Sequence, residues 1–170
     1  MPRADAPAPR LVWTRLAAGL GALVVVLGGK AGAEALERYR FALNETESLP
    51  NWAFVADQRS RHPGRGDLVV FRPPPTRFYP KGMAFAKIVG GVPGDRVEIR
   101  GQAFYVAGRY VGEAKRRAQD GQPAAIGPSG VIPAGHYFLY APHKDSLDSR
   151  YAMIGWVPQA RILGVAKAVM

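Results

Sequence analysis

Residues 83–89, MAFAKIV, decide the fold and contain the most informative side chain of this chain. The segment predicts a strand with apolar side chains on both faces, and two-residue alternation places Lys87 on the face of Phe85 and Val89. A buried ammonium group must reach water, find an acidic partner or lose its proton. Lowering a lysine pKa from ~10.4 to ~7.5 requires roughly 4 kcal/mol, the scale that burial supplies. The third outcome would make Lys87 a base near neutral pH.

Two plainer interpretations of Lys87 stay open at this point. The side chain can extend to water from its strand, or it can form an ion pair with an acid such as Asp95. Lys167 is a competing candidate because residues 165–169, VAKAV, are equally apolar. We expect Lys167 to reach water from an edge strand near the C-terminus.

An uncharged lysine can activate a serine hydroxyl, and residues 44–50, NETESLP, supply a candidate nucleophile in Ser48. Pro50 biases the preceding Leu49 towards an extended conformation, which predicts a hydroxyl presented on a stiff loop. In an extended loop Thr46 lies on the same side, and its hydroxyl could form an oxyanion hole with the Ser48 backbone N–H. The alternative is an ordinary turn, because Asn, Thr and Ser all favour turns.

The composition fits one folded domain and excludes several kinds of site. The chain has 170 residues, 48% of them hydrophobic, with 20 glycines and 15 prolines that favour strands and loops over a helix bundle. Without cysteine there is no disulfide, thiolate nucleophile or cysteine-bound zinc, and with 3 histidines we expect no metal or other cofactor. The net charge of +10 is dispersed apart from a run at 115–117, which favours an anionic membrane surface over nucleic acid.

The N-terminal region suggests a membrane segment. Residues 1–10 are expected to be a disordered tail, and residues 11–33 either a transmembrane anchor or a cleavable export signal. The uncharged part, 16–29, is shorter than the roughly 20 residues of a bilayer span, so Arg15 and Lys30 would have to snorkel. The basic residues on the two sides do not settle the orientation. A periplasmic domain over 34–170 follows only if the N-terminus stays in the cytoplasm.

Short apolar runs separated by Gly, Pro and Asp follow Phe41 and predict a mostly antiparallel β domain. Hairpin turns are expected at Gly101-Gln102 and Gly108-Arg109, and residues 112–130 are expected to be a mobile loop or insertion. The predicted strands are 67–71, 84–89, 96–100, 103–106, 110–112, 137–141 and 162–169.

Four segments in the same order together resemble the bacterial type I signal (leader) peptidases. They are RGDLVVF at 65–71, KIVGGVPGD at 87–95, IPAGHYF at 132–138 and SLDSR at 146–150. The serine segment departs from ordinary leader peptidases, because Leu-Pro follows Ser48 directly. Its pattern Asn-x-Thr-x-Ser-x-Pro is similar to the conjugative-transfer branch, the TraF-like pilin peptidases. Residues 140–144 also lack the Gly-Asp-Asn expected before SLDSR.

The resemblance implies a fold and a set of roles. The fold would be a mainly β, signal-peptidase-like antiparallel domain with an N-terminal membrane-spanning helix. Ser48 would be the nucleophile and Lys87 its general base, with Thr46 helping the oxyanion hole and Ser146 orienting the lysine amine. Asp148 and Arg150 would form a buried ion pair. Trp52, Phe54, Phe78 and Tyr79 could form an apolar skirt on the bilayer or pack in the core.

The function implied is that of a serine endopeptidase of the bacterial inner membrane, with its catalytic domain in the periplasm. It would mature, and in some members of the branch cyclise, a conjugative pilin for a type IV secretion apparatus. Its partners would be a prepilin or preprotein with small residues before the cut, membrane lipid and the conjugation machinery, with no nucleic acid. The alternatives are a general signal peptidase, a self-cleaving repressor-type regulator, and an inactive assembly module of a secretion machine.

Overall fold

A computed structural model describes residues 28–43, 49, 53–76, 78–79, 82–118 and 120–169. It divides the chain into two units, Met1–Arg38 and Tyr39–Met170. In the first unit, residues 28–38 form a helix with mostly exposed side chains. Within the described ranges no helix is both long and apolar enough to cross a bilayer, so the predicted membrane-spanning helix is not found there. The predicted tail, 1–10, and most of the predicted span, 11–33, lie outside the described residues.

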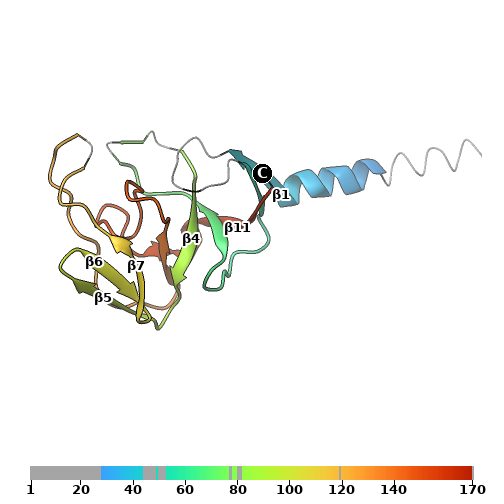
Figure 1. The fold of residues 1–170 in the computed structure, drawn as a ribbon. Helices are drawn as coiled ribbons and strands as arrows, with labels where there is room; N and C mark the ends of the chain where they lie inside the picture. The colour runs from blue at the N-terminus through green and yellow to red at the C-terminus, as the bar shows by residue number, and fades with distance from the viewer. Residues whose placement is uncertain are drawn as a thin grey trace, which may run out of the picture. The chain divides into compact units, whose positions relative to one another are not determined.

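The second unit confirms the predicted mainly β, antiparallel architecture (Figure 1). A seven-stranded sheet runs in the order β1 (Tyr39–Leu43), β2 (Ala53–Asp57), β11 (Ile162–Ala168), β3 (Leu68–Phe71), β4 (Phe85–Gly91), β9 (His136–Tyr140), β10 (Val157–Pro158). A four-stranded sheet runs in the order β7 (Arg109–Glu113), β6 (Ala103–Val106), β5 (Arg96–Arg100), β8 (Gly130–Val131). A short 3-10 helix, Gln159–Arg161, precedes β11.

Each predicted strand is present, and its bounds agree with the prediction to within two residues. The first hairpin turns at Gly101 (φ 65°) as predicted, whereas the second turns one residue earlier than predicted, at Ala107 (φ 47°) and Gly108 (φ 74°). Strands β1, β2, β8 and β10 were not predicted. The helix ends at residue 38, because the next residues form β1 and pair with β2, and that pairing is not visible in local sequence.

The larger sheet has a hydrophobic cluster on each face. Alternation along β3 directs Val69 into the cluster that holds Val89 and Leu139, and Val70 into the opposite cluster, with Phe54. Burial of these side chains is the main favourable contribution to folding. Phe54 is 0% exposed, so its assignment to a membrane-contacting skirt is wrong. Trp52 lies outside the described residues.

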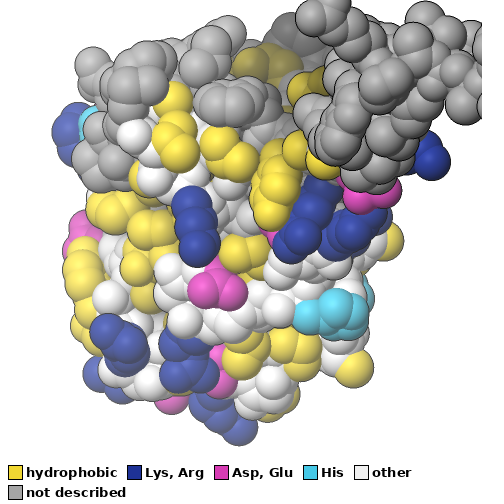
Figure 2. All heavy atoms as spheres, turned by 90° about the vertical axis from the view of Figure 1, so that its right-hand side faces the viewer, with side chains coloured by type: hydrophobic (Ala, Val, Ile, Leu, Met, Phe, Trp, Pro, Cys, Tyr) yellow, Lys and Arg dark blue, Asp and Glu magenta, His cyan; other side chains and the backbone are white. Residues whose placement is uncertain are grey.

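Strand β4, drawn yellow-green in Figure 1, is an inner strand of the seven-stranded sheet. It pairs with β3 on one side and with β9 on the other. On the face drawn in Figure 2, lysine and arginine side chains occur in small groups among hydrophobic and uncharged ones. An inner strand of the larger sheet therefore carries the unusual lysine.

Candidate active site

Lys87 lies in β4 with its side chain in the interior. The residue is 4% exposed and its backbone pairs with that of Val69 on β3. Val89 belongs to the same cluster as Val69, and Phe85 packs against that cluster, as the predicted alternation requires. The Lys87 Nζ lies 5.4 Å from the centroid of the Phe85 ring. An ammonium-bearing side chain thus stands among apolar neighbours.

This environment changes the acidity of Lys87. Burial lowers the pKa of Lys87 from 10.5 to about 8, while the charge of Asp148 acts to raise it and that of Arg150 to lower it further. No side chain in the described part of the chain gives the amine a hydrogen bond or an ion pair. Lys87 can therefore shed its proton close to neutral pH.

Both plainer interpretations of Lys87 are contradicted. At 4% exposure the side chain does not extend to water. Asp95 is engaged elsewhere, because its Oδ1 lies 2.5 Å from Arg65 Nη2 and its Oδ2 accepts the Val92 N–H at 2.9 Å. Asp95 thus stabilises the turn before β5 and does not pair with Lys87.

Lys167, the competing candidate, is exposed as expected, but for a different reason. Strand β11 lies between β2 and β3 and is not an edge strand. The pairing of β11 with β3 ends at Ala166, so Lys167 lies past the covered part of the strand. Position along the strand, and not position in the sheet, exposes it.

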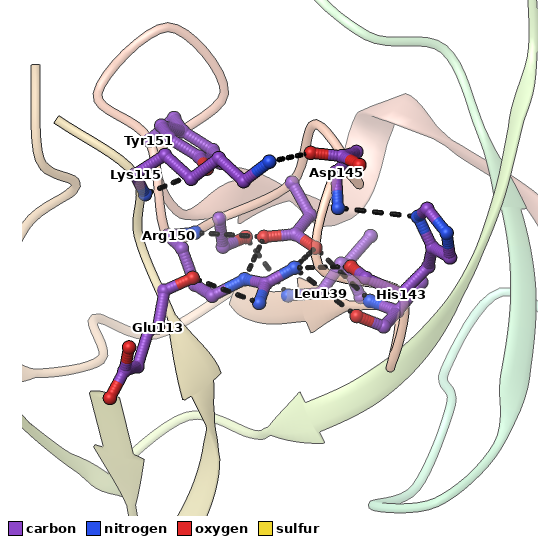
Figure 3. A network of polar contacts seen from close by, with 10 residues as sticks. Glu113, Lys115, Leu139, His143, Asp145, Arg150 and Tyr151 are labelled. Atoms are coloured by element: carbon purple, nitrogen blue, oxygen red, sulfur yellow. Dashed lines mark hydrogen bonds and ion pairs between the residues drawn. The ribbon is translucent and has the colours of Figure 1, made fainter. Parts of the chain in front are cut away.

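Asp148 and Arg150 form an ion pair that is almost fully buried, at 0% and 1% exposure (Figure 3). Arg150 Nε and Nη2 donate to the two carboxylate oxygens at 2.9 and 2.7 Å. Further guanidinium bonds reach the carbonyls of Ala141, His143 and Glu113 at 3.2, 3.3 and 3.2 Å. Burial acts to lower the pKa of Arg150, but the hydrogen bond and charge of Asp148 outweigh it and raise that pKa. The pair stays charged because its donors are matched by acceptors.

Neighbouring residues make room for this ion pair and bind its loop to the sheet. The Ser149 hydroxyl accepts the Leu139 N–H at 2.9 Å, and the Ser149 N–H donates to the Leu139 carbonyl at 2.9 Å. Gly112 has φ 130°, and a Cβ there would lie 2.5 Å from Arg150 Nη1. Sequence reasoning missed both roles. Ser149 stands inside the SLDSR segment, a usable signal, whereas nothing local marks Gly112.

The ion pair also ends strand β9 beside Lys87. Pairing between β4 and β9 includes Ile88 with Tyr140 and goes no further towards Phe85. The next residue, Ala141, gives its N–H to Asp148 Oδ2 at 3.1 Å and its carbonyl to Arg150. Among the described residues, the β4 backbone from 85 to 87 therefore has no strand partner on that side. An unpaired strand edge can bind an extended peptide.

Ser146 lies at the start of the same loop. It is 3% exposed, and its Oγ has no hydrogen-bond partner within the described ranges. A buried hydroxyl without a partner is costly and is uncommon outside functional sites. Ser146 also lines a cavity of about 520 Å³.

The candidate nucleophile Ser48 and the oxyanion residue Thr46 lie outside the described residues. Their neighbour Leu49 is described and is 6% exposed. It belongs to a cluster with Ala141, against which Ala86 packs. Leu49 is therefore anchored on the sheet face opposite to the one that holds Val69, Val89 and the Lys87 side chain. Within the described residues no group of His, Asp and Glu side chains could hold a metal ion.

Comparison with known proteins identifies the family of this chain. The model of the signal peptidase family, peptidase S26, matches residues 16–170. The chain is 31% identical over 168 residues to the conjugal transfer protein TraF of Agrobacterium fabrum strain C58, covering 88% of this chain and 92% of that protein. It is 30% identical over 147 residues to signal peptidase I of Pseudomonas aeruginosa, covering 63% of this chain and 49% of that protein. A crystal structure of a signal peptidase I from Enterococcus faecalis, 31% identical, aligns with a TM-score of 0.41 over 61% of this chain and 95% of that one. The chain belongs to the signal peptidase family, peptidase S26.

Proposed function

We propose that this chain is a membrane-bound serine endopeptidase that removes leader peptides, with Ser48 as nucleophile and Lys87 as general base. The observation that carries the proposal is the burial of Lys87, which lowers the pKa of its amine to about 8. A lysine that can be neutral near physiological pH is the partner a serine hydroxyl needs in the absence of a histidine base. Leu49 packs with Ala141, the residue after β9, on the sheet face opposite to Lys87, so Ser48 would reach the amine around the open edge of β4.

The reaction would proceed through an ester. Ser48 Oγ attacks the scissile carbonyl and its proton passes to Lys87 Nζ, while the Thr46 hydroxyl and the Ser48 N–H stabilise the oxyanion. The C–N bond then breaks, and Lys87 gives its proton to the leaving nitrogen. Water attacks the ester with Lys87 again accepting a proton, and collapse of this second intermediate returns that proton to Ser48.

Two neighbouring features would prepare Lys87 for this cycle. The Ser146 hydroxyl, which lacks a partner among the described residues, would hydrogen-bond the amine and orient it. The Asp148–Arg150 pair would hold the loop that presents Ser146. Because the two charges act on the Lys87 pKa in opposite directions, the pair changes the acidity of the amine less than the Asp148 charge alone would.

The substrate would bind as an added strand. The unpaired edge at residues 85–87 can hydrogen-bond an extended backbone of any sequence, which suits an enzyme that accepts leader peptides. The small residues expected before the cut would allow that backbone to lie close to the buried amine.

We further propose that the substrate is a pilin of a conjugation apparatus, since a relative that matches most of this chain is named a conjugal transfer protein. If the cut lay near the C-terminus of the pilin, the ester would hold the pilin itself. Attack by the pilin's own N-terminal amine, in place of water, would then form a peptide bond, release Ser48 and give a ring. Residues 11–33 would anchor the enzyme in the inner membrane, with residues 34–170 in the periplasm.

The central test replaces Lys87 by Met in the full-length, membrane-embedded protein, with Lys167→Met as the matched control. Cleavage of a prepilin should fall at least about 10³-fold in the first variant and stay unchanged in the second. Unaltered circular dichroism would show that the Lys87→Met variant is folded. Full activity of folded Lys87→Met would rule out Lys87 as the base.

A second candidate function is general processing of secretory precursors, favoured by the 30% identity to a signal peptidase I. Incubating the protein separately with a prepilin and with a secretory precursor distinguishes the two functions. Selective cleavage of the prepilin supports pilin maturation, and mass spectrometry identifies a cyclic product because it is one water lighter than the linear one. Equal cleavage of both supports the general enzyme.

A further inference from the structure

The cavity lined by Ser146 has a feature that the proposed mechanism does not use. Its volume is about 520 Å³, and its described walls come from three segments of the chain, at 78–79, 115–125 and 145–153. Such a volume is in the range of sites that enclose small ligands or several side chains. The cavity is therefore large enough to receive part of a peptide.

The cavity approaches Lys87 through two of its walls. One wall contains Tyr79, whose ring packs edge-on against Phe85 with centroids 4.8 Å apart. The Phe85 centroid is in turn 5.4 Å from Lys87 Nζ. The other wall contains Ser146, in the loop whose Asp148 influences the Lys87 amine electrostatically. Phe85 and Lys87 do not line the cavity themselves, so a group in the cavity would lie one layer of side chains away from the general base.

The wall formed by residues 115–125 is held in place by hydrogen bonds, although the sequence suggested a mobile loop. The Lys115 N–H donates to the Tyr151 hydroxyl at 3.0 Å, and the Ala124 N–H to the Arg116 carbonyl at 2.9 Å. The Lys115 ammonium also contacts Asp145, as Figure 3 shows. This segment is consequently attached to the loop that carries Ser146.

The lining combines apolar side chains with an excess of positive charge. Tyr79, Leu147, Tyr151 and Met153 supply apolar surface, and Met153 is 37% exposed at the cavity. Lys115 and Arg117 are the cations in the described lining and Asp145 the acid. The Asp145 carboxylate is already neutralised by Lys115 and by Lys144, whose Nζ lies 3.1 Å away. Arg117 donates to the Gly121 carbonyl at 2.9 Å, and no carboxylate of a described residue pairs with it.

We propose that this cavity binds the leaving side of the substrate, the segment that follows the scissile bond, and selects a bulky apolar residue together with an acidic one. The inference rests on the proposed function, because Lys87 must return its proton to the leaving nitrogen, which places that segment beside the lysine. The acyl side remains attached to Ser48. Among the described residues none from 39–57, the strands that flank Ser48, lines the cavity. The apolar walls take the bulky side chain, and Arg117 takes the carboxylate.

The charge preference is tested with Arg117→Gln in the full-length protein and Arg116→Gln as the matched control. Arg116 is the exposed neighbour and does not line the cavity. Peptide substrates identical before the cut carry either Glu or Gln after it. Arg117→Gln should lower kcat/KM about tenfold for the Glu peptide only, and Arg116→Gln for neither. Equal effects of Arg117→Gln on both peptides, or none, would overturn the assignment.

The size preference is tested with Ala125→Phe, which adds bulk at an exposed position on the cavity wall, and Ala134→Phe, an exposed position that does not line it. Ala125→Phe should reduce kcat/KM about tenfold for peptides with Phe or Leu after the cut, and little for those with Ala. Ala134→Phe should change neither. Loss of selectivity for residues before the cut, with no change after it, would assign the cavity to the acyl side and contradict the proposal.

A binding measurement separates this inference from the proposed function. The free leaving peptide is titrated by calorimetry into the Lys87→Met protein and into Lys87→Met with Arg117→Gln. Binding that weakens about tenfold in the double variant supports the cavity assignment without relying on turnover. No binding, or equal binding, overturns it. Continued cleavage by Lys87→Met would instead refute the proposed function.

Discussion

Lys87 and Arg150 both carry buried cationic groups, at 4% and 1% exposure, yet their surroundings shift their pKa values in opposite directions. Arg150 is bonded to a carboxylate and three carbonyls, and its pKa is raised. Lys87 faces an aromatic ring and aliphatic side chains, and its pKa falls to about 8. Burial alone therefore does not decide whether a cation keeps its proton. The hydrogen-bond acceptors that surround the cation decide whether it keeps its proton.

The two sites serve different purposes as a consequence. Arg150 remains charged throughout the working pH range and binds the end of β9 to the loop at 141–150. Lys87 can cycle between protonated and neutral forms, as a general base must. The Asp148 carboxylate connects the two sites, since it pairs with Arg150 and also acts on the Lys87 pKa.

The largest effect is expected when Arg150, the buried cation with hydrogen-bond acceptors, is replaced. Arg150→Met leaves Asp148 buried without its counter-ion and should lower the free energy of unfolding by about 3–5 kcal/mol. Arg100→Met is the control, because Arg100 pairs with Glu98 on the surface at 3.1 Å, and it should cost less than about 1 kcal/mol. Urea denaturation of both variants measures the difference. Equal losses would show that the buried pair is no more stabilising than the exposed one.

The next largest effect is expected when Lys87, the buried cation without such acceptors among the described residues, is replaced. Because the Lys87 pKa falls from 10.5 to about 8 on folding, the unfolded chain binds more protons between those values, and wild-type stability should rise as pH increases from about 8 to 10.5. Below pH 8 the Lys87 amine is protonated in both the folded and the unfolded protein, so the full free-energy cost of burying its charge lowers the stability. Lys87→Met should therefore raise the free energy of unfolding at pH 7 by up to about 3 kcal/mol and remove this pH dependence. If Lys87→Met were less stable than the wild type at pH 7 and kept the same rise of stability with pH, the lowered pKa of Lys87 would be contradicted.

A smaller effect tests the space around Arg150. Gly112→Ala introduces a Cβ 2.5 Å from the guanidinium at a φ of 130°, so it should cost about 1–3 kcal/mol. Gly64→Ala is the control, since a Cβ there meets nothing nearer than 3.7 Å. Thermal unfolding of the two proteins checks the prediction, and an unchanged melting temperature for Gly112→Ala would show that Arg150 can move aside.

The smallest effect examines the coupling between the sites. In the wild type, kcat/KM should rise with pH with an apparent pKa near 8, because the free enzyme needs neutral Lys87. Removing the Asp148 charge in Asp148→Asn removes the interaction that raises the Lys87 pKa, so the profile should move to lower pH. Assays are run at a temperature where the variant is shown to be folded. If the profile of Asp148→Asn moved to higher pH instead, the Asp148 charge would lower the Lys87 pKa, contrary to the direction assigned here.

Local sequence was sufficient for much of the fold and for the choice of Lys87. Two-residue alternation predicts β4 and the face on which Lys87 lies, and turn residues such as Gly101 mark hairpins, since these features depend on near neighbours. The SLDSR segment pointed to Asp148 and Arg150 through the resemblance. Ser48 and Thr46, outside the described residues, stay predictions.

Only the tertiary structure decided how these residues are surrounded. The burial that lowers the pKa of Lys87 depends on the pairing of β4 with β3, and one acceptor of Arg150, the Glu113 carbonyl, lies 37 residues away in the sequence. The pairing of β1 with β2 and the cavity beside Tyr79 likewise arise from segments that meet only on folding. Periodicity determines which face a side chain occupies, whereas desolvation and hydrogen bonding depend on everything that packs against that face.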